Sequence, residues 1–200
     1  MSITAMSLWK KLPKIPKDQE QKLTRPRGIS TSRVVMVCPT PNEEDYSNNL
    51  PFSSRYAAVF TDVVREAKIN PSKFFVIPCC RYGAKALSKN TLDIRDFVLE
   101  AIRREIFNFI ITVGDDATKW IVNGGKKVNM GYFYNKLVYP PNLFHKPLFV
   151  FPDPKGLIPV PTDDEREAWW RQRSAEMLAE RIEKYARTLA RALNMKNYHG

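Results

Sequence analysis

Cysteine is scarce in this chain, and long apolar runs are absent. Three cysteines occur among 200 residues, and two of them, Cys79 and Cys80, are adjacent. That set does not form the framework of a disulfide-stabilised secreted domain, so we expect a reducing compartment. No run approaches membrane-spanning length, and the N-terminus lacks the apolar core of a signal peptide. We therefore expect a cytoplasmic protein without a membrane partner.

A metal centre is not expected either. An iron–sulfur cluster requires four thiolates or close substitutes, and the chain offers Cys38 and the adjacent pair. The same shortage argues against a zinc or redox site. The two histidines are His145 and His199, and the second lies in the tail. We expect no metal and no cofactor.

Acidic residues are few relative to basic ones. The chain has 21 Asp and Glu against 32 Lys and Arg, which gives a formal net charge of +11. That balance favours a polyanionic partner, most often nucleic acid, over the alternative of a basic protein with solvated charges. The length fits one domain, and 44% hydrophobic residues can form its core.

Residues 1–32 have the composition of a basic arm. Lys10, Lys11 and Lys14 alternate with apolar residues and prolines, which favour extended backbone over helix. The arm is either a disordered tail on the domain or a segment that tracks phosphates, with Trp9 as an anchor or stacking ring. The expected divisions are an arm at 1–32, a domain at 33–195 and a tail at 196–200.

Beyond the arm, short β-branched runs alternate with helical patterns. The runs predict strands at 34–38, 74–77, 108–114 and 147–151, with 136–139 as a candidate short strand. Helical spacing predicts helices at 53–68, 92–105, 115–122 and 162–193. This order predicts an α/β fold, a three-layer sandwich around a central, mostly parallel four-stranded sheet.

Each predicted strand ends in a polar loop. These loops, at 39–52, 78–85, 114–116 and 152–157, should gather at the carboxyl edge of the sheet, where such folds bind ligands. Asp115 and Asp116 open a helix and are interpreted as groups that suit its dipole.

The loop motifs, in this order, resemble the uracil-DNA glycosylase superfamily over roughly residues 33–193. In its thermostable, iron–sulfur branch the first loop reads Gly-Glu-x-Pro-Gly-x-x-Glu-Asp, then Gly-x-Pro-Phe. Residues 37–45 lie in register with it, and Pro51-Phe52 follows one residue late. The Cys-Arg after the second family strand matches Cys80-Arg81.

Two later motifs extend the resemblance. The family's Leu-Gly-x-x-Ala corresponds to residues 113–117. Its last motif, His- or Asn-Pro-Ser with Gly-Leu in some branches, corresponds to residues 153–157. A second fit, at residues 139–143, ranks lower because 149–151 is the better core strand.

The resemblance implies a DNA-binding protein that flips a base out of the stack. Phe52 would stack on that base, and the backbone around Cys38, Pro39 and Thr40 would hold the pyrimidine edge and a phosphate. Leu157 would press into the minor groove as a wedge. The other expected contacts come from Arg81, Lys155, Gly156, Lys10, Lys11 and Lys14. Phe52 could instead be a core aromatic, and Leu157 a partly buried loop residue.

The family's catalytic side chains are replaced. The water-activating position of the first motif is Cys38-Pro39, the base-reading Asn position is Pro78, and the His position is Asp153. Proline offers no side-chain hydrogen bond, and a carboxylate would repel an anionic uracil leaving group. Glu44, Asp45 and Asp153 remain as candidate general bases, or as surface and capping carboxylates.

Three hypotheses follow from these observations. The first is a recognition or accessory subunit that binds single-stranded or damaged duplex DNA and has weak or lost base-excision activity. It would belong to a replication or transcription assembly, and this hypothesis includes a viral assembly of that kind. The second is an active DNA glycosylase for uracil or a modified pyrimidine. The third is a protein-interaction module on the same fold, for which exposed Trp9, Trp169 and Trp170 would be suited.

Overall fold

The computed structural model describes residues 3–14, 24–53, 57–81, 87–154 and 167–194. Within these residues one sheet has the strand order β2-β1-β3-β5-β4. Its strands are β1 (Val34–Cys38), β2 (Phe74–Pro78), β3 (Phe109–Val113), β4 (Leu137–Val138) and β5 (Leu148–Phe151). The sheet confirms the predicted mostly parallel architecture and adds β4 at one edge.

The four longer strands run parallel, and every residue in them is buried. Successive side chains therefore enter two different cores, as the two-residue period of a strand requires. Val35 and Val37 join one core, while Val34 and Met36 join the other. β4 is short and runs antiparallel to β5 at the edge of the sheet.

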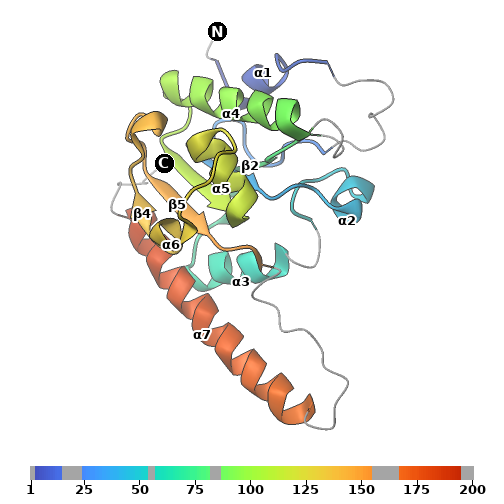
Figure 1. Ribbon diagram of the computed structural model, residues 1–200, viewed down its shortest axis with the longest axis vertical. Coiled ribbons are helices and arrows are strands. Elements are labelled where there is room, and N and C mark those ends of the chain that lie inside the picture. The colour runs from blue at the N-terminus through green and yellow to red at the C-terminus, as the bar shows by residue number, and fades with distance from the viewer. Residues whose placement is uncertain (1–2, 15–23, 54–56, 82–86, 155–166, 195–200) are drawn as a thin grey trace.

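Helices cover both faces of the sheet (Figure 1). One face carries α1 (Ala5–Trp9), α4 (Leu87–Arg103) and α5 (Gly114–Asn123), and the other carries α3 (Ala57–Glu66) and α7 (Glu167–Asn194). The arrangement confirms the predicted three-layer sandwich.

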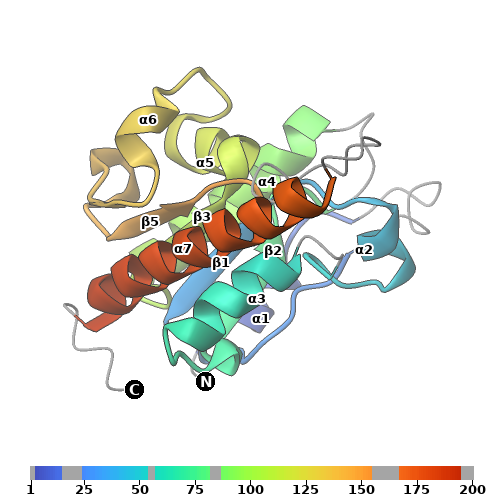
Figure 2. The same ribbon diagram turned by 90° about the horizontal axis from the view of Figure 1, so that it is seen from below.

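The last helix, α7, has 28 residues and is about 42 Å long at 1.5 Å per residue. Leu178, Ile182 and Leu189 lie on its inward face and pack in the core beneath the sheet. Figure 2 shows the helix crossing this face beside α3. Among the described residues, no helix combines the length and apolarity that crossing a membrane requires.

The helix α1 was not expected, because residues 1–32 were predicted to be an extended arm. Thr4 is the N-cap of this helix. Its hydroxyl accepts a hydrogen bond from the backbone N–H of Ser7, and the Ser7 hydroxyl accepts one from the backbone N–H of Thr4. The helix ends before Pro13, so the prolines do not interfere with it. Leu8 and Trp9 are buried on α4, and the Trp9 side chain is only 8% exposed. The prediction of an exposed Trp9 ring is therefore wrong, although the ring does anchor the segment.

The segment Thr24–Arg27 lies beside β2. The backbone N–H of Arg27 donates to the carbonyl of Val76 at 3.0 Å, and the Val76 N–H donates back at 2.8 Å. Thr24 donates to the carbonyl of Arg81 at 3.1 Å. This segment, called the strap below, thus adds hydrogen bonds to the outer edge of the sheet.

Four short helices connect the main elements. They are α2 (Glu43–Ser47), η2 (Pro71–Lys73), α6 (Met130–Phe133) and η4 (Pro141–Leu143). Because β4 is antiparallel to its neighbour, the residues 139–143 that follow it lie at the amino edge of the sheet. The lower-ranked second fit of the last family motif is therefore wrong.

Candidate functional site

The strand order places a topological switch point, called the crevice below, at the carboxyl ends of β1 and β3. The chain moves from β1 outward to β2, then crosses back over β1 to β3 and continues toward β5. The loops after β1 and β3 therefore diverge, and such a switch point is where open α/β sheets bind ligands. The first family motif and the glycine turn both lie there.

Three predicted motif residues meet in this crevice. Gly114 has a φ of +81°, which favours glycine. A Cβ placed on it would lie 3.6 Å from Pro39 Cγ and 3.6 Å from Asp153 Cβ. The structure thus brings together the loops after β1, β3 and β5.

The loop after β2 joins the same edge through its cysteines. The backbone N–H of Cys79 donates to the carbonyl of Cys38 at 2.9 Å, and the Thr40 hydroxyl lies 3.5 Å from Cys79 Sγ. The carbonyl of Cys38 is therefore already engaged within the protein. Pro78 ends β2 opposite Cys38, at the position of the family's base-reading Asn.

The three thiols are buried and differ in acidity. Burial raises the pKa of Cys38, although the nearby Arg27 charge opposes this. A hydrogen bond with Cys80, followed by burial, raises the pKa of Cys79, and the same bond lowers the pKa of Cys80. Cys80 is thus the more acidic member of the adjacent pair.

Asp45 closes the first loop. One carboxylate oxygen accepts hydrogen bonds from the backbone N–H of Ser53 at 2.6 Å and from its hydroxyl at 3.2 Å. The other accepts from the N–H of Asn42 at 3.1 Å, while Asn42 Oδ1 caps α2 at the N–H of Asp45. Only 5% of Asp45 is exposed. Its position gives Asp45 a structural role, whereas Glu44 is exposed on α2.

Phe52 adopts an unusual backbone conformation. Its φ is +54°, in the left-handed region that residues other than glycine rarely adopt. Arg27 Nη2 donates to the Phe52 carbonyl at 3.2 Å, and the Phe52 ring contacts that of Phe60 edge-to-face at 6.0 Å. The side chain is 6% exposed and packs in the core between β1 and α3. Strained residues that neighbouring structure holds in place are concentrated at functional sites.

Arg81 is placed inside the protein, between the loop after β2 and α1. Its guanidinium lies 5.5 Å from the centre of the Trp9 ring, and Nη1 donates to the carbonyl of Pro13 at 2.9 Å. Its exposed fraction is 8%. These contacts join the N-terminal segment to β2.

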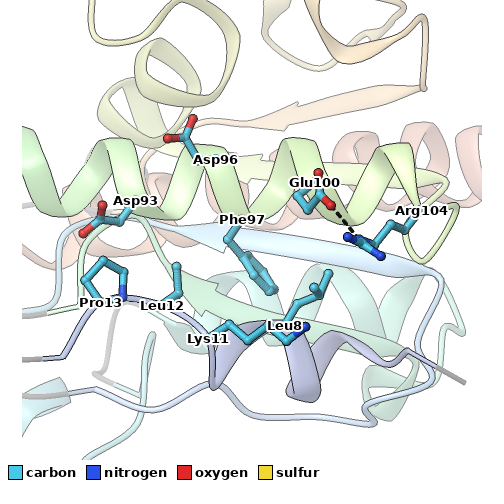
Figure 3. Close-up of a pocket in the computed structure, with 9 residues that line it drawn as sticks. All are labelled: Leu8, Lys11, Leu12, Pro13, Asp93, Asp96, Phe97, Glu100 and Arg104. Atoms are coloured by element: carbon cyan, nitrogen blue, oxygen red, sulfur yellow. Dashed lines mark hydrogen bonds and ion pairs between the residues drawn. The ribbon is translucent and has the colours of Figure 1, made fainter. Parts of the chain in front are cut away.

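Lys10, Lys11 and Lys14 are exposed, as a phosphate-binding arm requires. Lys11, however, also lines a cavity of about 350 Å³ between α1 and α4 (Figure 3). The other lining residues are Leu8, Leu12, Pro13, Asp93, Asp96, Phe97, Glu100 and Arg104. Asp93, Asp96 and Glu100 give this cavity three carboxylates, which would repel a phosphate group placed there.

Tyr46 follows the acidic run of the first loop and was not predicted as a site residue. It is half-buried, and burial is the main cause that raises its pKa to about 12, followed by the nearby Cys80 and Glu43. A phenol that stays protonated can donate a hydrogen bond at any physiological pH. Its position, directly after Asp45, was the only sequence signal.

The shifted pKa of Tyr46 predicts an alkaline loss of stability. Between pH 10 and about 12 the unfolded chain releases this proton while the folded protein retains it, so the free energy of unfolding falls as the pH rises. Tyr46→Phe removes that contribution and should show a shallower fall. Urea unfolding at intervals from pH 9 to 11.5 measures both slopes, and equal slopes would contradict the assignment.

Among the described residues, carboxylates predominate at the carboxyl edge of the sheet, where the strand-end loops lie. Glu43, Glu44, Asp115, Asp116 and Asp153 all lie in or directly after its loops. The Tyr134 hydroxyl donates to Asp115, and Lys119 lies 3.7 Å from Asp116. No group of three or more His, Cys, Asp or Glu within the described part of the chain could hold a metal ion.

Some predicted residues lie outside the described part of the chain. These are Lys155, Gly156 and Leu157, which follow the last strand. The side chains of Trp169 and Trp170 are also not described. Their expected roles remain predictions.

An α/β sandwich with motif loops at a β1/β3 crevice defines the class of protein. The family model of the uracil DNA glycosylase superfamily matches residues 26–183, which is more than half of the chain. The chain therefore belongs to this superfamily, whose members act on DNA. The match begins within the strap and includes all four motif loops. No curated protein matches the sequence significantly.

Proposed function

We propose that this protein recognises single-stranded or damaged duplex DNA at the β1/β3 crevice and has weak or no base-excision activity. It would act as a recognition or accessory subunit in a replication or transcription assembly. The observation that carries the proposal is the meeting of Pro39, Gly114 and Asp153 at the switch point, within a chain of this superfamily. The site has the family's position but not its catalytic side chains.

The chemistry of the crevice supports reduced excision. Pro39 and Pro78 supply no proton acceptor where the family has a water-activating group and an Asn. Asp153 would oppose the negative charge that develops on a leaving uracil. The Asp45 carboxylate is engaged by the N–H groups that close its own loop.

A second candidate, an active glycosylase with a rebuilt site, is favoured by the position of Asp153. Its Cβ lies beside Gly114, so its carboxylate belongs to the same edge as the first loop. A general base must lie within hydrogen-bond reach of the water that it activates. Asp153→Ala abolishes base release if this candidate is correct.

Phe52 provides the sharpest test of base recognition. Phe52→Leu keeps an apolar side chain in the core but removes the ring. If the ring stacks on an extrahelical base, the preference for a duplex with a uracil mismatch over a matched duplex should fall by roughly 1–3 kcal/mol. Fluorescence anisotropy with two labelled duplexes measures this preference.

Phe60→Leu is the matched control. The Phe60 ring contacts that of Phe52 in the same core and is equally buried, but Phe60 lies on α3 and not in the loop that follows β1. Both variants should lose similar stability, whereas only Phe52→Leu should lose the preference. Equal preferences in the two variants would make Phe52 a packing residue and remove the base-stacking part of the proposal.

A further inference from the structure

The peptide between Phe52 and Ser53 is held at both of its polar groups by charged side chains. Its carbonyl accepts a hydrogen bond from Arg27 Nη2 at 3.2 Å, and its N–H donates to an Asp45 carboxylate oxygen at 2.6 Å. The carbonyl and the N–H of a trans peptide point in opposite directions, so the two side chains approach it from opposite sides. The peptide clamp, as used below, consists of Arg27, Asp45 and this peptide.

The signs of the two charges suit the peptide that they hold. A peptide dipole has its negative end at the carbonyl oxygen and its positive end at the N–H. The Arg27 guanidinium lies at the first end and the Asp45 carboxylate at the second, so both charges stabilise the same orientation. Asp45 is 5% exposed and Arg27 is half-buried, so water screens these interactions less than it would at the surface.

The peptide clamp accounts for the unusual backbone of Phe52. A φ of +54° is unfavourable for a residue that carries a side chain. Rotation of Phe52 to a common conformation would reorient the peptide that follows it and break the hydrogen bonds to Arg27 and Asp45. It would also move the Phe52 ring out of its edge-to-face contact with Phe60. The two charges therefore determine where this ring lies.

The cation of the clamp comes from the strap, ahead of every motif residue of the strand-end loops. The backbone hydrogen bonds between Arg27 and Val76 fix the strap against β2, and the Arg25 N–H donates to the carbonyl of Asn49 in the first loop at 3.5 Å. Burial raises the pKa of the Cys38 thiol and the Arg27 charge opposes this rise, so the guanidinium also lies near the end of β1. Arg27 thus connects the strap to both ends of the first loop.

We propose that Arg27 and Asp45 are positioning residues of the crevice, and that the peptide clamp holds Phe52 in the place where it recognises an extrahelical base. The inference rests on the proposed function, because Phe52 is the residue proposed there to stack on the base. Neither charged side chain needs to touch the nucleic acid, since each acts through the backbone of Phe52. The functional site therefore includes the strap as well as the motif loops.

The first experiment tests the clamp without DNA. Amide hydrogen exchange of Ser53 is measured by NMR relative to that of Ile111 in β3, which corrects for changes in global stability. Arg27→Met should raise this relative rate roughly ten-fold or more, because a hydrogen bond from a charged group is lost. Arg27→Lys keeps a charged donor and should raise it less than about three-fold. An unchanged Ser53 rate in Arg27→Met would overturn the proposal.

Ser32→Ala is the matched control for Arg27→Met. Ser32 is 7% exposed, and its hydroxyl donates to the carbonyl of Lys73 and accepts from the N–H of Val34 at 3.1 Å. Its loss should lower the global stability and leave the relative rate of Ser53 within about two-fold of the wild type, because these bonds lie outside the clamp. Equal rises in the two variants would make Arg27 a general structural residue and overturn the proposal.

The second experiment tests the role of the clamp in recognition. The preference for a duplex with a uracil mismatch over a matched duplex is measured by anisotropy, as for Phe52→Leu. This preference is a ratio of two affinities, so a loss of attraction to phosphates that both duplexes share cancels. Arg27→Met should lower the preference roughly five-fold or more, whereas Arg27→Lys and Ser32→Ala should keep it within about two-fold of the wild type.

A double variant shows whether Arg27 acts through Phe52. In the Phe52→Leu background, Arg27→Met should lower the preference no further, because the ring that it positions is absent. A further loss as large as that of the single variant would overturn the proposal and place Arg27 in direct contact with the base. A wild-type protein without any preference would contradict base recognition in the proposed function, and the Ser53 exchange rates would still decide whether the two charges hold the peptide.

Discussion

Replacing Asp45 with alanine is expected to lower the free energy of unfolding by about 3 kcal/mol. The substitution removes the acceptor of two loop N–H groups and one hydroxyl, and hydrogen bonds to charged groups contribute about 1.5–3 kcal/mol. The buried position leaves the freed N–H groups little access to water. Urea unfolding monitored by circular dichroism measures the difference.

Glu44 is the matched control for Asp45. It carries the same charge on the neighbouring position but is exposed, so Glu44→Ala should change stability by less than about 0.5 kcal/mol. Asp45→Asn keeps one acceptor oxygen and should give an intermediate loss. If Asp45→Ala were as stable as Glu44→Ala, the Asp45 carboxylate would not be holding the first loop in place. The prediction that Asp45 is a general base would then regain support.

Replacing Gly28 with alanine is expected to cost about 3 kcal/mol or more. The φ of Gly28 is +101°, a region that is closed to other residues, and an added Cβ would lie 2.0 Å from the carbonyl oxygen of Phe74. Both atoms are backbone-fixed, so the strap or β2 must move. The displaced strap would also release Arg27 from the Phe52 carbonyl.

Thermal unfolding of Gly28→Ala measures this cost. Gly124→Ala is the control, because Gly124 also has a positive φ, of +60°, but a Cβ there would meet nothing within 4 Å. Its loss should therefore reflect the cost of the left-handed backbone conformation alone and be about 1 kcal/mol. Equal losses at the two glycines would show that the strap does not lie against β2 as described.

The central elements of the fold are predictable from the sequence because their patterns are local. The sequence predicts strands at 34–38 and 108–114. The structure has strands at Val34–Cys38 and Phe109–Val113, so their bounds change by one residue at most. Parallel strands buried on both faces have nearly continuous apolar sequences, which are easy to find. The four strand-end loops follow directly from that order.

Short capped helices were missed because their signals are brief. The Asn42 cap with Asp45 at the third helical position is a capping box that predicts α2, and Thr4 with Ser7 does the same for α1. Both signals were present in sequences that otherwise look like loop or arm.

Tertiary contacts of single residues could not be predicted. Nothing local indicates that Arg81 lies against Trp9, or that Arg27 bonds the Phe52 carbonyl, because each pair comes from distant parts of the chain. The exposed state of Tyr132 and Phe144 is of the same kind, since aromatic residues are more often buried. The candidate site was therefore predicted in position but not in internal structure.

The central claim is that a crevice with the superfamily's position recognises DNA without efficient base excision. The most direct test is a single-turnover assay on labelled oligonucleotides that contain uracil, hydroxymethyluracil, hypoxanthine or a thymine mismatch, in single and double strands. Binding is read from the same samples, and abasic products are detected by strand cleavage. We predict binding with little or no base release. Rapid release that disappears in Asp153→Ala would contradict the claim and establish an active glycosylase with a rebuilt site.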